Sequence, residues 1–241
     1  MSGVGPRSYL SSLNIPIVYD QTFTGQFMSD NPRNQITITP SFPLNDIGVR
    51  VAGITRSFYI EAVSGMAPFF SPVSPILFRD PFPSLNLNVL SIVEKVSRPL
   101  STGTLRLASP TNANLTPIVR FNYFNDTIDL SQCANAMRAI GKMLRTPVME
   151  QYKSMDQRGQ RYFQFVGRAL PQSQFDDEAM GEFCRKTLTT IYHYHGGCLV
   201  QKVVDSHLKV IGINALRVVD GSTFVVSPGT NPQATLMMFG R

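Results

Sequence analysis

The chain has 241 residues, of which 43% are hydrophobic, enough to form the core of one or two domains. Charged residues make up only 16%, against about 25% in an average soluble domain, which excludes a disordered chain and indicates that much surface is covered. The net charge of +6 is scattered without basic runs or interleaved aromatic residues, and no apolar stretch is long enough to cross a membrane, so neither nucleic-acid binding nor a membrane span is predicted.

Short extended runs, separated by Pro and Gly, dominate the first third of the chain and are typical of strands. The predicted strands cover residues 15–19, 35–39, 49–54 and 57–63. The segment 66–87 that follows is rich in Pro, Phe and Ser and has no clear period. It predicts a long covering loop, and such loops often form the wall of a pocket.

Alternation of apolar and polar residues in the middle of the chain predicts two half-buried strands, at 102–108 and 117–123. Apolar residues then recur at helical spacing after Asp129, which is expected to cap the N-terminus of a helix. Acidic residues at 176–178 begin a second predicted helix, whose apolar stripe continues to Ile191.

The last quarter of the chain predicts a hairpin and a helix. Apolar runs at 199–204 and 208–213 flank a turn, a further strand is expected at 216–219, and a helical pattern covers 233–239. Because strands and helices are both present without regular alternation, the predicted class is α+β, with a mixed or antiparallel sheet covered by helices.

Two of the three histidines lie close together, as His193 and His195, and are followed by Gly196, Gly197 and Cys198. No further Cys or His stands at ligand spacing, so no metal site is predicted. The pattern also suits buried structural histidines at a tight turn, in which the glycines permit close packing.

Asn231 stands before Pro232 at the start of the last predicted helix. Proline is favoured in the first turn, so backbone N–H groups are expected to point outward there and to stabilise an anion. The alternative is that Asn231 only caps its own helix.

Ordered motifs along nearly the whole chain resemble the glucose–methanol–choline (GMC) flavoprotein oxidoreductases, in the plant branch that holds (R)-mandelonitrile lyases and HOTHEAD-like proteins. The motifs are SGVGP at 2–6, GQF at 25–27, DNP at 30–32, RPLSTG at 98–103, HYHGGC at 193–198, LRVVDGS at 216–222 and NPQ at 231–233. The resemblance implies the end of an FAD-binding domain at 1–40, a substrate-binding domain at 41–190 and a return segment carrying the active site at 191–241.

The resemblance also implies roles for individual residues. His193 matches the histidine that accepts the hydroxyl proton while hydride leaves for flavin N5, and Asn231 matches the position that hydrogen-bonds the substrate oxygen. The positions matching flavin contacts are Tyr192, His193, Asp220, Gly221, Asn231, Pro232 and Gln233. The expected substrate contacts are Tyr59, Glu61 and Ile191.

The implied substrate is a small alcohol, or a cyanohydrin if the chemistry is that of the lyases. The lyases have Tyr, Cys and His where this chain has Ile191, Glu61 and Asn231, so alcohol oxidation is favoured over hydroxynitrile lysis. Members of the family begin with a Gly-x-Gly-x-x-Gly turn for the FAD pyrophosphate, and this sequence has none. The chain is therefore expected to be the C-terminal part of a longer enzyme whose FAD-binding half is missing, or an inactive remnant.

Cys133 and Cys184 match a disulfide of the lyase relatives, although two ordinary buried cysteines remain the alternative. Glycosylation sequons begin at Asn114 and Asn125. Both features favour an oxidising, secretory compartment for the parent protein, although the start of this chain has no signal-peptide pattern.

Overall fold

The computed structural model describes residues 2–45, 48–66, 88–229 and 231–241, so nearly all of the predicted covering loop at 66–87 lies outside the described residues. The chain divides into two compact units, each built from separate stretches of sequence. Unit 1 comprises Met1–Asn31, Arg98–Asp126 and Tyr192–Arg241, and unit 2 comprises Pro32–Ser97 and Thr127–Ile191.

Unit 2 contains a six-stranded antiparallel sheet with helices on one side. Its elements are β4 (Pro32–Thr39), β5 (Gly48–Ile54), β6 (Phe58–Met66), β7 (Asn88–Val96), α2 (Thr127–Leu144), η1 (Pro147–Tyr152), β10 (Ser154–Met155), β11 (Arg161–Tyr162), β12 (Gln164–Phe165), α3 (Asp177–Thr187) and β13 (Thr189–Thr190). The strand order is β12-β4-β7-β6-β5, and β13 also pairs with β4.

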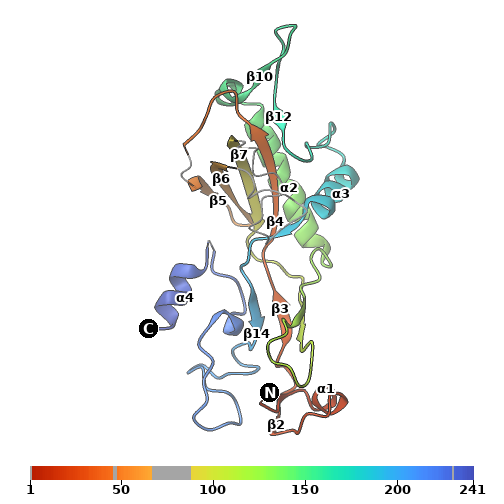
Figure 1. The fold of residues 1–241 in the computed structure, drawn as a ribbon, viewed down its shortest axis with the longest axis vertical. Coiled ribbons are helices and arrows are strands. Elements are labelled where there is room, and N and C mark those ends of the chain that lie inside the picture. The colour runs from red at the N-terminus through yellow and green to blue at the C-terminus, as the bar shows by residue number, and fades with distance from the viewer. Residues whose placement is uncertain (1, 46–47, 67–87, 230) are drawn as a thin grey trace. The chain divides into compact units, whose positions relative to one another are not determined.

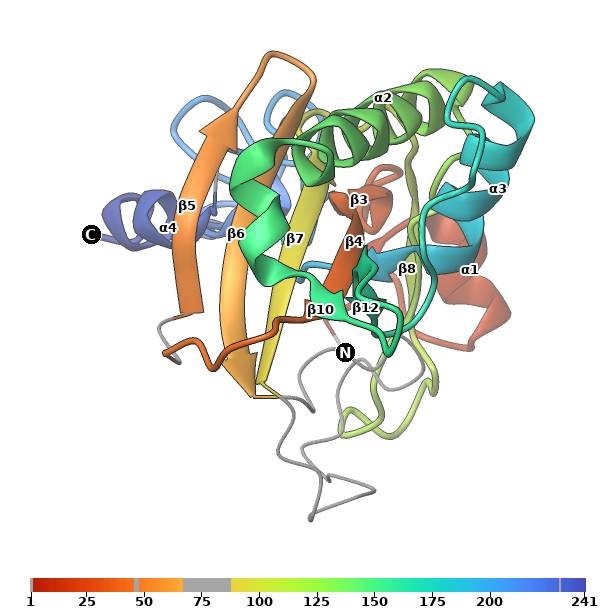
Figure 2. The same ribbon diagram turned by 90° about the horizontal axis from the view of Figure 1, so that it is seen from above.

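Helix α2 packs on strands β7, β6 and β4, and Figure 2 shows it lying across these strands. Its buried face carries Met137 and Ile140, which are fully buried. A disulfide between Cys133 and Cys184 joins α2 to α3, with the two Cα atoms 6.4 Å apart. The side-chain amide of Asn34 on β4 donates to the carbonyl of Cys184 at 2.8 Å, so this bridge lies against the sheet. The disulfide that the resemblance implies is therefore confirmed.

The helix boundaries of unit 2 partly differ from those predicted. Helix α2 begins at Thr127, so Asp129 lies inside its first turn and is fully buried there rather than capping it. Asp176 does cap α3, because its side chain accepts the backbone N–H of Ala179. Helix α3 ends at Thr187 and the chain then pairs with β4, so Ile191 lies beyond the helix that was predicted to reach it.

Unit 1 contains a four-stranded antiparallel sheet and a small parallel strand pair. Its elements are β1 (Val4–Gly5), α1 (Arg7–Ser12), β2 (Tyr19–Asp20), β3 (Gln26–Ser29), β8 (Gly103–Arg106), β9 (Ile118–Arg120), β14 (His195–Gly197), η2 (Gly221–Thr223) and α4 (Gln233–Phe239). The order in the larger sheet is β14-β3-β8-β9, and Figure 1 shows β3 and β14 side by side. The strand predicted at 15–19 is wrong except at Tyr19, which begins β2.

The hairpin predicted at 199–213 does not form as two regular strands. Turns joined by isolated bridges, such as Val204 with Val210, replace it. Val203, Val204 and Val210 instead form a small core of their own, so the apolar pattern reports burial rather than strand pairing. The final helix is confirmed, since α4 covers the predicted residues 233–239.

Strands and helices without regular alternation confirm the α+β class. Among the residues that the structure describes, no helix is long and apolar enough to cross a membrane.

Candidate active site

The strand β14 that carries His195 depends on two glycines for its place against β3. Gly196 has a φ of +81°, and a Cβ added there would stand 2.0 Å from the carbonyl oxygen of Phe27. Gly197 also has a positive φ, of +100°. No residue with a side chain fits at Gly196, and this explains why glycines follow the two histidines in the sequence.

The backbone just before β14, at Tyr192 and His193, has an unusual conformation. Tyr192 has a φ of +63°, a left-handed conformation that is rare for a bulky residue. The next backbone N–H, that of His193, donates to Oδ1 of the buried Asp30 at 2.9 Å. The hydroxyl of Tyr123 donates to the other carboxylate oxygen of Asp30. Strain of this kind persists only where the surrounding structure enforces it, and here Asp30 supplies a restraint.

The second histidine of the motif has a structural place. His195 is buried, and its Nδ1 lies 3.0 Å from the carbonyl oxygen of His193. Because a carbonyl oxygen can only accept, Nδ1 carries the proton of the neutral ring. Burial lowers the pKa of His195, while the contact with His193 and the charge of Asp30 oppose that shift. His195 is therefore a neutral ring that braces the backbone of His193.

The structure brings His193 and Asn231 to one pocket, of about 610 Å³. Its lining residues are Tyr192, His193, Asn231, Pro232, Gln233, Leu236 and Met237. Helix α4 begins at Gln233 with Pro232 as its N-cap, and Pro232 supplies no side-chain capping bond. Asn231 stands one residue before this N-cap.

Two of the positions expected to contact flavin, Asp220 and Gly221, are not among the residues that line this pocket. Asp220 caps the short helix η2, with its carboxylate accepting the backbone N–H of Ser222 at 2.8 Å. A Cβ on Gly221 would stand 3.3 Å from the carbonyl oxygen of Tyr194 and 3.5 Å from the side chain of Leu236. Since Leu236 lines the pocket, Gly221 supports its wall.

The expected substrate residues Tyr59 and Glu61 lie in unit 2, on one face of β6. The hydroxyl of Tyr59 donates to the carboxylate of Glu61, and both side chains are buried. Ile60, which lies between them, is the cross-strand neighbour of Glu94 on β7, and Glu94 is the neighbour of Asn34 on β4. These three residues share one face of the sheet, and it is the helix-covered face because Asn34 bonds Cys184 of α3. Because successive side chains alternate, Tyr59 and Glu61 lie on the face opposite α2. Ile191 is half-buried at the end of the same unit.

Sequence reasoning missed three residues, one beside Tyr59 and two beside His193. Lys95, on β7, is buried with its ammonium 4.8 Å from the ring centroid of Tyr59. Burial, together with the hydrogen bond to Glu61, raises the pKa of Tyr59. Asp30 and Tyr123 were also given no role, although Asp30 belongs to the motif DNP; its sequence position carries no sign of the distant backbone N–H that it binds.

The remaining predicted positions have simple surroundings. Asn114 and Asn125 are both exposed, as acceptors of an oligosaccharide would be. His207 is exposed in a turn, where its backbone N–H donates to Asp205. Within the described ranges, no group of three or more His, Cys, Asp or Glu side chains could hold a metal ion.

Comparison with known proteins places the chain in a family. The family model described as GMC oxidoreductase matches residues 99–240. The chain belongs to the GMC oxidoreductase family.

Named relatives are similar along the whole chain. It is 53% identical to sinalpyl alcohol oxidase Nec3 of Nesocodon mauritianus and 51% identical to an (R)-mandelonitrile lyase-like protein of Arabidopsis thaliana, with 100% of the chain matched. The chain spans only 43% and 44% of the lengths of these two relatives.

Solved structures share the fold. A formate oxidase of Aspergillus oryzae matches 99% of the chain and 49% of its own length, with a TM-score of 0.81 at 18% identity. Pyridoxine 4-oxidase from Mesorbium loti matches 98% of the chain and 46% of its own length, with a TM-score of 0.78 at 16% identity.

Proposed function

We propose that this chain supplies the C-terminal part of an FAD-dependent oxidoreductase that acts on CH–OH donors. The observation that carries the proposal is the shared pocket of His193 and Asn231, which come from positions 38 residues apart in the sequence. An imidazole and a side-chain amide at one pocket are the groups needed to take a proton from a hydroxyl and to hold its oxygen.

The residues around the pocket fit the ring end of FAD but not its nucleotide end. Tyr192 and the segment from Asn231 to Gln233 line the pocket and can contact a flat ring system. The sequence contains no Gly-x-Gly-x-x-Gly turn for a pyrophosphate, so the nucleotide would be held by residues outside this chain. When bound, FAD supplies the acceptor for the hydride.

His193 acts as the base in this proposal. Its imidazole takes the proton of the substrate hydroxyl as the O–H bond breaks, and the electron pair of the C–H bond leaves with its hydrogen as hydride. Asp30 accepts the backbone N–H of His193, and the ring of His195 bonds the carbonyl of His193, so the backbone that carries the base is held at two points. The amide of Asn231 donates to the substrate oxygen. Tyr59, Glu61 and Ile191 are proposed to contact the substrate.

A hydroxynitrile lyase is the second candidate, because one relative is named (R)-mandelonitrile lyase-like at 51% identity. A lyase would act on a cyanohydrin and release cyanide without net oxidation. Where the lyases have Tyr, Cys and His, this chain has Ile191, Glu61 and Asn231, and this difference favours oxidation. A third candidate is an inactive remnant.

The test uses the flavin-loaded protein that carries these residues, under anaerobic conditions. A primary alcohol is expected to bleach the flavin absorbance. The change His193→Asn should slow bleaching by about 10²- to 10⁴-fold while flavin stays bound, because the general base is lost. Asn231→Ala should also slow it, whereas Asn231→His should retain much of the rate because histidine can hold the same oxygen.

The matched control is His207→Asn, since His207 is exposed in a turn of the same unit. It should leave the rate of bleaching unchanged. If the protein releases cyanide from mandelonitrile and no alcohol bleaches its flavin, the oxidoreductase proposal is wrong and the lyase takes its place. If a flavin-loaded protein catalyses neither reaction, the inactive remnant is favoured.

A secretory-pathway location is proposed for the same protein. The support is the disulfide between Cys133 and Cys184 and the exposure of both sequon asparagines. Endoglycosidase treatment of the protein from its native tissue should lower its apparent mass.

A further inference from the structure

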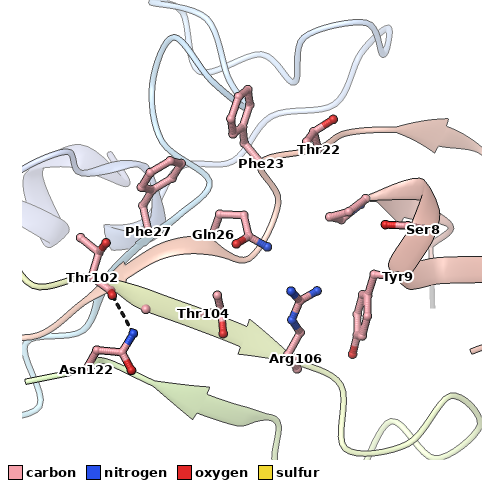
Figure 3. A pocket seen from close by; sticks show the side chains of 12 residues that line it. Ser8, Tyr9, Thr22, Phe23, Gln26, Phe27, Thr102, Thr104, Arg106 and Asn122 are labelled. Atoms are coloured by element: carbon pink, nitrogen blue, oxygen red, sulfur yellow. Dashed lines mark hydrogen bonds between the residues drawn. The ribbon is translucent and has the colours of Figure 1, made fainter. Parts of the chain in front are cut away.

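A second pocket of unit 1, of about 770 Å³, lies away from the residues that line the first. Its walls come from helix α1, the turn before β3, and strands β3 and β8 (Figure 3). Gln26 of β3 is paired with Thr104 of β8, and Arg106 follows two residues later. Because alternate residues of a strand share a face, Thr104 and Arg106 point to the same side, and Figure 3 shows both beside the pocket.

Arg106 is a cation whose hydrogen-bonding capacity is unused within the described part of the chain. Its guanidinium lies 4.4 Å from the ring centroid of Tyr9 and makes no hydrogen bond or ion pair with the described residues. The Tyr9 ring is itself fixed, because its hydroxyl accepts the backbone N–H of Leu107 at 2.8 Å. Stacking on a fixed ring orients the guanidinium while leaving its in-plane donors for a ligand.

The charges around this pocket favour an anion. Arg106 is the only charged residue in its described lining, which holds no carboxylate. Lys202, close to the pocket wall, adds a second cation, with its ammonium 4.8 and 5.0 Å from the rings of Phe23 and Phe27. By contrast, the cations Lys153 and Arg161 at another pocket, in unit 2, already engage Glu150.

The opposite wall is aromatic. The rings of Phe23 and Phe27 lie 6.1 Å apart with an interplanar angle of 36°. Phe27 has a φ of +58°, which is rare for a bulky residue, and such outliers cluster at ligand sites. Figure 3 shows both rings on the side of the pocket away from Asn122 and Thr104.

We propose that this pocket binds a small aromatic carboxylate. The carboxylate would pair with the guanidinium of Arg106, whose fork of donors matches its two oxygens. The planar ring would pack on Phe23 and Phe27, and Gln26 and Thr104 would bond polar ring substituents. A monoanion suits the single cation in the lining, and the volume lies within the range of small-molecule sites.

The test is isothermal titration of the purified protein with 4-hydroxycinnamate. Saturable binding with one ligand per chain is expected. The corresponding 4-hydroxycinnamyl alcohol, which lacks the charge, and acetate, which lacks the ring, should each bind at least about tenfold more weakly. Arg106→Gln should weaken binding of 4-hydroxycinnamate about 10- to 100-fold, and Arg106→Lys should restore part of it.

The matched control is Arg56→Gln, which removes the same charge from an exposed arginine of unit 2. It should leave the affinity unchanged, and an equal loss would show that only net charge matters and overturn the proposal. The His193→Asn protein should bind 4-hydroxycinnamate with unchanged affinity. A loss of affinity in this variant would show that the ligand binds in the first pocket instead. No saturable binding, or unchanged binding by a folded Arg106→Gln protein, would overturn the proposal as well.

Discussion

At the scale of single residues, several neighbours of His193 hold its backbone. Tyr192 is strained, Asp30 bonds the backbone N–H of His193, and Gly196 lets β14 approach β3. Each of these features acts on the backbone. Substitutions that disturb the backbone should therefore damage the site as strongly as substitutions in the pocket.

Gly196→Ala tests the close approach of β14 to β3. The new Cβ would stand 2.0 Å from the carbonyl oxygen of Phe27 at a φ of +81°, so the change should lower the free energy of unfolding by about 3 kcal/mol or more. Gly159→Ala is the matched control, because Gly159 has a φ of +77° and nothing within 4 Å of such a Cβ. It should cost only about 1 to 2 kcal/mol. Urea unfolding measures both, and equal losses would contradict the contact with Phe27.

His195 makes the stability of the protein depend on pH. Its pKa is lowered below 6.5 by burial, so the unfolded chain binds the proton more readily than the folded one. The stability that neutral His195 provides is present above pH 6.5 and is lost as the pH falls below it. Between about pH 7.5 and about pH 5.5, urea unfolding should show a smaller loss of stability for His195→Asn than for the unchanged protein. His207→Asn, at an exposed site, should not alter that pH dependence.

At the scale of elements, the disulfide between Cys133 and Cys184 links helices α2 and α3 of unit 2 covalently. It closes a loop with a sequence separation of 51 residues. The chain-entropy model assigns such a loop about 4 kcal/mol. Cys133→Ala combined with Cys184→Ala should lower the free energy of unfolding by at least this amount, and added reductant should then have no further effect. Cys198→Ala, which removes the free thiol, should keep the sensitivity to reductant.

The predictions of helices and strands succeeded where the spacing of apolar residues or a capping residue marks the element. Strands β5 and β6 and helices α2, α3 and α4 follow period or capping signals and were found nearly in place. Strand β7 was missed because it is buried on both faces almost throughout, so its sequence shows no alternation. The hairpin at 199–213 was wrong because its apolar residues pack into a local core instead of pairing regularly.

At the scale of the whole molecule, the matched relatives are more than twice as long as this chain. The 241 residues hold the pocket that is proposed to contact a flavin ring, and their sequence has no Gly-x-Gly-x-x-Gly turn for a pyrophosphate. Purified alone, the chain is therefore expected to be colourless and to retain no FAD. The same residues in a polypeptide that also carries a Gly-x-Gly-x-x-Gly unit should retain it. Absorption spectroscopy distinguishes the two, and a yellow preparation of the isolated chain would contradict this expectation.

The sequence by itself determined the family and the α+β class and singled out His193 and Asn231 as candidate site residues, because ordered motifs and local periodicity are properties of the linear chain. Only the tertiary structure decided that these two residues share a pocket, that Asp30 holds His193, and that Arg106 stacks on Tyr9. These contacts join residues from 38 to 163 positions apart in unit 1. No local pattern encodes such distances, since they arise from how the sheet and its turns pack.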